Sequence, residues 1–131
     1  MASWLIKFAM CALMPRTDAL PGIEDTEIDA FLRRLRADAE PLYWVGLVVG
    51  AVVFAVTPIV TVWVPLPAFL LPRRLLDRHA ERLTYERGYL LRQAVFLVRL
   101  SAGMYWGADP AVRARLSLAP YASDPGTFRV A

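Results

Sequence analysis

The sequence predicts an all-α protein folded as a single helical domain over residues 1–131. Apolar residues recur at steps of three and four in several segments, which is the period of an amphipathic helix. No segment alternates apolar and polar residues in the manner of a half-buried strand. A chain of 131 residues also has room for only one hydrophobic core.

The first predicted helix runs from Ser3 to Met14, where Pro15 stops it. Residues 15–25 contain prolines, a glycine and aspartates, and they predict a connecting loop. A second helix follows, with Asp25 or Thr26 as its cap and acidic residues in its first turn, where the helix dipole favours negative charge. Its apolar stripe consists of Ile28, Phe31, Leu32 and Leu35.

The middle of the chain is a long apolar segment, residues 42–71, that carries no charge. Its length exceeds the roughly 20 apolar residues that a helix needs to cross a bilayer. One hypothesis is that residues 43–64 span or dip into a membrane, with a kink near Pro58. The other is that an apolar helix ends before Pro58 and a proline-rich arm then crosses the surface of the domain or of a partner. We prefer the spanning hypothesis, in which aromatic residues lie at opposite interfaces and the following arginines stay in the cytoplasm.

The last third of the chain predicts further helices and a tail. Residues 73–87 are expected to form a polar helix, and residues 89–106 a strongly apolar one. A short helix follows, with Asp109 as its N-cap, and ends near Leu118. Residues 119–131 are rich in proline and small residues, which predicts an extended tail.

The composition predicts apolar surface that the chain does not cover by itself. Apolar residues make up 57% and charged residues 21%, and the mean hydropathy is +0.41, so the chain is more apolar than an ordinary soluble domain. Such a surface needs lipid or another protein to cover it. The net charge of +3 comes from the second half of the chain, which suits anionic lipid or an acidic protein. Nucleic acid is not expected as a partner, because no basic run exceeds two residues.

Residue types that carry catalysis or hold metals are scarce. The chain has one histidine, His79, and one cysteine, Cys11, which are too few for a set of converging metal ligands. No Gly-x-Ser-x-Gly turn and no Gly-x-Gly phosphate loop is present in the sequence. The sequence therefore predicts no catalytic, cofactor-binding or metal-binding residue, and we interpret His79 as an ordinary helix residue.

Two groups of residues in and beside the predicted helix 89–106 are candidates for contact with a partner or with lipid headgroups. Arg92 and Arg99 are seven residues apart and share one stripe of an apolar helix, so they either mark its solvent face or meet an acid or a phosphate. Tyr105 and Trp106 are residue types enriched in protein interfaces, although core packing at the end of the helix would use them equally well.

The order of the segments is similar to that of a known family. An apolar helix runs into MPRTDALPGIEDTEIDAFLRRL, a long apolar segment follows, and YLLRQAVFLVRLSAGMYWGADPAVRARLSL comes last. This order resembles the small accessory subunit of glucose-methanol-choline type flavin dehydrogenases, the family named after subunit 3 of gluconate 2-dehydrogenase. The matching positions are Pro15, Arg16, Thr17, Asp18, Pro21, Gly22, Asp25 and Phe31 in the first block, and Tyr105, Gly107, Asp109, Pro110, Val112 and Arg113 in the last.

The resemblance implies a noncatalytic subunit that binds, stabilises or tethers to the membrane a FAD-dependent alcohol or sugar dehydrogenase. FAD and the catalytic groups would then belong to the large flavoprotein subunit, and this chain would bind no cofactor. We expect the chain to be located in or at the bacterial inner membrane. The residues expected to contact the partner or headgroups are Arg92, Arg99, Tyr105, Trp106, Asp109 and Arg113. The alternative is a small integral membrane protein of structural or regulatory type that has no flavoprotein partner.

Overall fold

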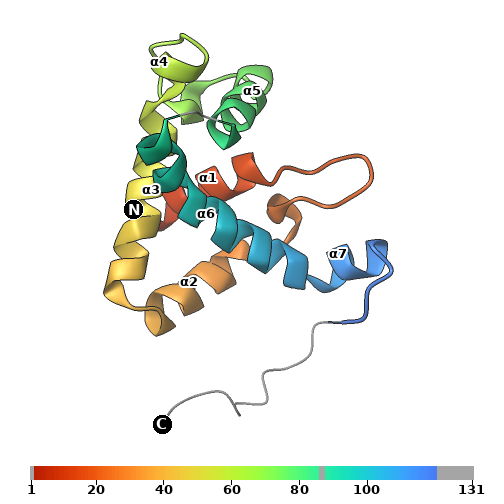
Figure 1. Ribbon diagram of the computed structural model, residues 1–131. Helices are drawn as coiled ribbons and strands as arrows, with labels where there is room; N and C mark the ends of the chain where they lie inside the picture. Colours follow the sequence, from red (N-terminus) through yellow and green to blue (C-terminus); the bar gives the residue numbers. More distant parts are fainter. Residues whose placement is uncertain (1, 86–87, 121–131) are drawn as a thin grey trace.

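The computed structural model describes residues 2–85 and 88–120, and every regular element in these residues is a helix (Figure 1). The elements are α1 (Ala2–Leu13), η1 (Ile23–Asp25), α2 (Ile28–Asp38), α3 (Pro41–Val56), α4 (Pro58–Thr61), η2 (Ala68–Leu70), α5 (Arg73–Thr84), α6 (Tyr89–Ala108) and α7 (Pro110–Arg115). Short 3-10 helices are labelled η. The all-α class predicted from the sequence is confirmed.

Helix α1 forms the centre of the core, because α2, α3, α5 and α6 all pack against it. Its residues Ile6, Ala9 and Met10 are completely buried. Helices α3 and α6 also pack on each other, and Gly50 allows this contact. A Cβ atom at Gly50 would lie 2.3 Å from the carbonyl oxygen of Ala94, so the two backbones approach only where a side chain is absent.

Most helices begin close to the predicted residue. Helices α1, α5, α6 and α7 start at the predicted position or next to it, and Asp109 caps α7 as predicted. The Oδ2 atom of Asp109 accepts hydrogen bonds from the backbone N–H groups of Ala111 and Val112. Helix α5 ends at Thr84 and α7 at Arg115, which is earlier than predicted. Most of the predicted tail lies in residues 121–131, outside the described residues.

The predicted cap of α2 is wrong. Glu27 occupies the cap position, and no side chain forms a capping hydrogen bond. The hydroxyl group of Thr26 instead donates to the carbonyl oxygen of Ile23 at 2.6 Å, and the carboxylate of Asp25 is bound by Arg16. Both candidate caps therefore stabilise the loop in front of the helix, a choice that spacing along the sequence does not reveal.

The apolar segment 42–71 is divided into several pieces. Helix α3 ends at Val56, α4 is a single turn, and a proline-rich arm containing η2 leads to α5. The kinked helix predicted over residues 43–64 is therefore not formed. Within the ranges 2–85 and 88–120, no helix has the length and apolar character needed to cross a membrane. The early end of α3 and the arm agree with the hypothesis that placed a break before Pro58, and the missing N–H group of proline is the cause.

A buried histidine compensates for the break at Pro58. Because proline lacks an N–H group, the carbonyl oxygen of Phe54 loses its donor from the next helical turn. The Nε2 atom of His79 lies 2.7 Å from that oxygen, and Nδ1 lies 2.5 Å from the hydroxyl oxygen of Thr61. Both His79 and Thr61 are buried. The imidazole ring thus connects α5 to α3 and to α4, a structural role that its interpretation as an ordinary helix residue missed.

The two hydrogen bonds assign the tautomer of the neutral ring. Nε2 carries the proton that it donates to the carbonyl oxygen of Phe54, and the unprotonated Nδ1 accepts from the hydroxyl group of Thr61. Burial lowers the pKa of His79 below its ordinary value of 6.5, because an imidazolium ion is poorly solvated inside the core. The fold therefore favours the neutral form of this histidine.

Replacing His79 with alanine should lower the free energy of unfolding by about 3 kcal/mol, because the change leaves a cavity and removes the donor to a buried carbonyl group. Urea-induced unfolding followed by circular dichroism measures the difference. The neighbouring exposed residue provides the control, since Arg78→Ala should change the free energy by about 0.5 kcal/mol or less. Equal effects of the two substitutions would disprove the structural role of His79.

Stability should also fall as the solution is acidified from about pH 7 to about pH 5.5. The pKa of His79 is lowered in the folded protein, so the unfolded chain takes up the proton first and gains stability relative to the fold as the pH drops through 6.5. Urea midpoints measured across this range test the prediction. Because His79 is the only histidine in the chain, His79→Phe should flatten the pH dependence in this window. An unchanged slope in that variant would contradict it.

Candidate partner-binding site

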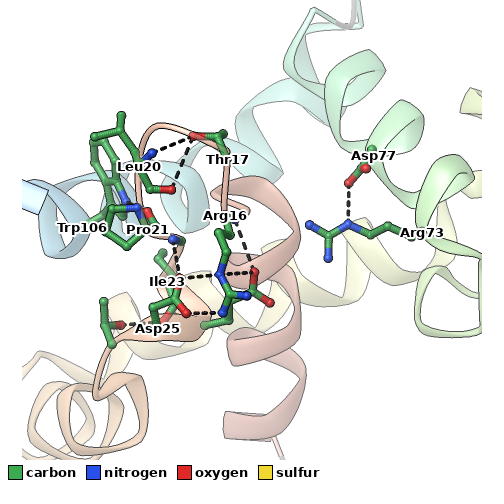
Figure 2. Close-up of polar contacts among 12 residues, drawn as sticks. Arg16, Thr17, Leu20, Pro21, Ile23, Asp25, Arg73, Asp77 and Trp106 are labelled. Carbon is green, nitrogen blue, oxygen red and sulfur yellow. Dashed lines mark hydrogen bonds and ion pairs between the residues drawn. The ribbon is translucent and has the colours of Figure 1, made fainter. Parts of the chain in front are cut away.

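The loop between α1 and α2 is held in one conformation by Arg16 and Asp25 (Figure 2). The Nε atom of Arg16 donates to Oδ2 of Asp25 at 2.8 Å, and the backbone N–H of Gly22 donates to the same oxygen at 3.0 Å. These hydrogen bonds from Arg16 and Gly22 lower the pKa of Asp25. Gly22 has to be glycine, because a Cβ there would lie 2.3 Å from the backbone nitrogen of Arg16.

The same loop is attached to the end of α6. The indole Nε1 of Trp106 donates to the carbonyl oxygen of Pro21 at 2.8 Å, as Figure 2 shows. One residue earlier, the ring of Tyr105 stacks on Phe31 of α2, with 4.3 Å between the centroids and 17° between the planes. The first and last blocks of the family resemblance, which are far apart in the sequence, therefore pack together at this end of the molecule.

A groove of about 780 Å³ lies between α2 and the second half of α6, and we call it the α2–α6 groove. Its walls include Phe31 of α2 and Met104 of α6, and the side chain of Met104 is largely exposed. Tyr43 of α3 also lines it and shares a hydrogen bond with Ser101. Most of the lining is apolar, which is typical of a surface that another molecule covers.

Two glycines of α6, Gly103 and Gly107, line this groove one helical turn apart. A Cβ atom added at either position would meet nothing within 4 Å. In contrast, Gly22, Gly46 and Gly50 each make a close approach inside the chain. A glycine inside a helix costs about 1 kcal/mol relative to alanine. No contact among the described residues explains that cost at Gly103 and Gly107.

Two charged side chains line the groove. Glu27 directly precedes α2 and Arg34 lies within it, and the two are seven residues apart, which is about two helical turns. Within the described part of the chain, neither side chain forms an ion pair. The groove therefore presents an acid and a base along one apolar channel.

The structure brings some of the predicted contact residues together and separates others. Tyr105 lines the groove, and Trp106 anchors the loop beside it. Asp109 caps α7, and the guanidinium group of Arg113 donates to the carbonyl oxygens of Ala119 and Gly107, so both stabilise this end of the fold. Arg92 and Arg99 are exposed on α6 and do not line the groove. Both interpretations of these two arginines, a solvent-facing stripe or contact with an acid or a phosphate, therefore stay open.

Of the residues that line the groove, the sequence selected only Tyr105 as a contact residue. Phe31 and Gly107 entered as positions of the family resemblance, Glu27 and Arg34 only as helix residues, and Gly103 was not selected. The available signal was the Gly-x-x-x-Gly spacing in α6, which places two small residues on one helix face. That spacing alone does not tell whether the face is filled from inside the chain or open.

The described residues offer little for chemistry. Throughout residues 2–85 and 88–120, no three side chains of histidine, cysteine, aspartate or glutamate lie close enough to hold a metal ion. Cys11 is half-buried, and burial raises the pKa of its thiol, which disfavours the nucleophilic thiolate.

Comparison of the chain with protein-family models, with curated proteins and with solved structures found no match.

Substituting alanine for Gly103 or Gly107 should raise the free energy of unfolding of the isolated chain by roughly 0.4–1 kcal/mol each, because alanine restricts the unfolded chain and meets open space in the fold. Gly50→Ala is the matched control in the crossing of α3 and α6, and it should destabilise, because its Cβ would collide with the backbone of Ala94. Urea-induced unfolding measures all three. Destabilisation by the two groove substitutions would show that the space opposite them is occupied within the chain.

Proposed function

We propose that this chain is a noncatalytic accessory subunit that binds and stabilises a FAD-dependent alcohol or sugar dehydrogenase of the glucose-methanol-choline type. In this proposal the flavin and the reacting groups belong to the large subunit. The identity of the partner comes from the resemblance of the two sequence blocks. The α2–α6 groove is the surface through which this chain binds.

The observation that carries the binding role is the pair of glycines facing open space in the groove. Two helix-weakening residues stand where the described part of the chain makes no use of their small size. Glycines one turn apart let the backbone of another helix come close, which side chains would prevent. A helix of the partner that fills the groove would explain why Gly103 and Gly107 are glycines.

Charge gives the docked helix a direction. A partner segment with a basic residue opposite Glu27 and an acidic residue about two turns away opposite Arg34 would match the groove. Complementary charges at the rim fix register and suppress wrong partners more than they add affinity. The apolar walls, including Phe31 and the exposed Met104, would supply most of the binding free energy.

The remaining residues of the resemblance support the groove without touching a partner. Arg16, Asp25 and Gly22 hold the loop, and the loop holds Trp106 through the carbonyl oxygen of Pro21. Tyr105 is thereby kept against Phe31. In this proposal the family pattern preserves the shape of a docking surface rather than a set of reacting groups.

A second candidate function is a small membrane protein of structural or regulatory type without a flavoprotein partner. The uncharged segment 42–71, much of which is exposed on α3 and α4, favours it. The two candidate functions differ in whether a flavoprotein co-purifies with the chain. The alternative predicts that the chain stays with the membrane fraction and is recovered without any flavoprotein.

A tagged copy should co-purify with a yellow flavoprotein, identified by its flavin absorbance and by mass spectrometry. Gly103→Leu and Gly107→Leu should reduce the recovery of the flavoprotein at least tenfold, because a leucine side chain fills the space that the partner helix needs; a tenfold loss corresponds to about 1.4 kcal/mol. Gln93→Leu places the same side chain at an exposed position of α6 outside the groove and should leave recovery unchanged. Recovery of the unsubstituted chain without flavin would refute the proposed function, and full recovery with both groove leucines would refute the groove as its site.

A further inference from the structure

The side of α3 that faces away from the core is apolar along its whole length. The exposed residues follow one another at steps of three and four, so they share one face of the helix. The exposed fractions of these residues lie between 44% and 78%, and the residues are Leu42, Val45, Val49, Val52 and Val56. Ile59 and Val60 of α4 are also exposed and extend the stripe. We call these seven residues the α3 apolar face.

Helix α4 follows α3 after a single residue, Thr57, so the exposed residues of α4 come directly after those of α3. The backbone N–H group of Thr57 donates to the carbonyl oxygen of Val53, and the carbonyl oxygen of Thr57 accepts from the N–H group of Thr61, so Thr57 belongs to the last turn of α3 and to the first turn of α4. On the opposite side of α3, Leu47 and Phe54 are completely buried. The exposed stripe is thus the outer half of a helix whose inner half builds the core.

Amphipathic aromatic residues and arginines lie at the α4 end of this face. Trp63 is 80% exposed and Tyr85 is 78% exposed, and both line a hollow that Val60 also lines. Arg78, Arg82 and Glu81 line the same hollow, so its charge is positive on balance. The guanidinium group of Arg82 is held by the carbonyl oxygen of Thr61, which ties this cluster to the end of α4.

We propose that the α3 apolar face lies on the surface of an anionic lipid bilayer, with α3 parallel to the membrane plane and Trp63, Tyr85, Arg78 and Arg82 at the level of the headgroups. This contact goes beyond the proposed function, since it uses other residues than the α2–α6 groove. Aromatic residues beside arginines are typical of the boundary between hydrocarbon and headgroups. Arginine favours lipids with negative headgroups, and the chain as a whole carries a net charge of +3.

The length of α3 fits the parallel orientation. A helix of 16 residues is about 24 Å long, which is shorter than the roughly 30 Å of bilayer hydrocarbon. Lying flat, the helix immerses its whole outer stripe at once while its core-facing side stays packed on α1 and α6. Residues that the sequence made candidates for spanning would thus contact lipid without crossing it.

Lipid suits this face better than a protein partner does. The stripe consists of valine, leucine and isoleucine and offers no side-chain hydrogen-bonding group, whereas protein interfaces form about one hydrogen bond per 100–200 Å². Arg92 and Arg99 are not part of it, because α6 packs on α3 near Ala94 and Val98, and the two arginines project from the other side of α6.

The test uses the purified full chain and lipid vesicles in a flotation assay, with no flavoprotein present, so its result is independent of the proposed function. Vesicles of phosphatidylcholine mixed with phosphatidylserine should bind the chain at least tenfold more strongly than vesicles of phosphatidylcholine alone. Val49→Asp should reduce binding at least tenfold, because it places a charge in the middle of the face. Gln93→Asp adds the same charge on the exposed side of α6 and should have a much smaller effect.

Two further measurements test the orientation. Arg78→Gln should weaken the preference for phosphatidylserine without abolishing binding, and the fluorescence of Trp63 should shift to shorter wavelengths on binding, a shift that Trp63→Phe removes. Circular dichroism checks that each variant keeps its helix content. Equal vesicle binding by Val49→Asp and the unsubstituted chain would overturn the proposal. The proposal would also be overturned if the unsubstituted chain bound neither kind of vesicle. A third contrary outcome is that the unsubstituted chain is a dimer that does not bind lipid and that Val49→Asp converts to a monomer, which would assign the face to a second copy of the chain.

Discussion

The hydrogen bond from the imidazole ring of His79 to the carbonyl oxygen of Phe54 is the contact on which the arrangement of the apolar half depends. Pro58 removes a backbone donor in the middle of the longest uncharged segment, and an unpaired carbonyl group there would be buried at a substantial cost. His79 supplies a donor from α5 and accepts from Thr61 on its other side. The imidazole ring therefore supplies the donor that the carbonyl oxygen of Phe54 lacks, and it connects α4 to α5. The same contacts place α4 beside α5, whose Arg78 and Arg82 line one hollow with Trp63.

The molecule has two separate surfaces, and in our proposals one binds a protein and the other binds a lipid bilayer. The α2–α6 groove is formed by α2 and the second half of α6, while the α3 apolar face belongs to α3 and α4. Helix α3 contributes to both, since Tyr43 lines the groove whereas Leu42 is exposed on the apolar face. A protein in the groove and a bilayer against the apolar face would use separate residues, which is what a subunit that tethers an enzyme to a membrane requires.

Periodicity in the sequence predicted the helices well, because the contacts that define them are local. Asp109 as the cap of α7 follows from residues within a few positions of each other, and so does the disruption at Pro58, although the preferred hypothesis of a kinked helix over residues 43–64 underestimated it. The features that involve distant residues could not be predicted. The residues around His79 do not indicate that its ring will bind a carbonyl oxygen 25 residues away. The residues around Asp25 do not indicate that its carboxylate will bind Arg16 instead of capping the following helix. Composition did predict exposed apolar surface, but not which helix would carry it.

Glycine and valine show why the candidate surfaces needed the structure. Gly50 and Gly103 look alike in the sequence, yet the first is pressed against Ala94 and the second faces open space. Valine, in the same way, is a weak helix former and a poor residue for a face in water, and a helix exposed only to solvent would gain from glutamate, lysine or arginine at those positions. Helix α3 nevertheless carries valine at Val45, Val49, Val52 and Val56, all exposed. Helix propensity and exposure to water therefore both disfavour valine along the entire stripe, and in our proposal the contact with the bilayer removes the second of these costs.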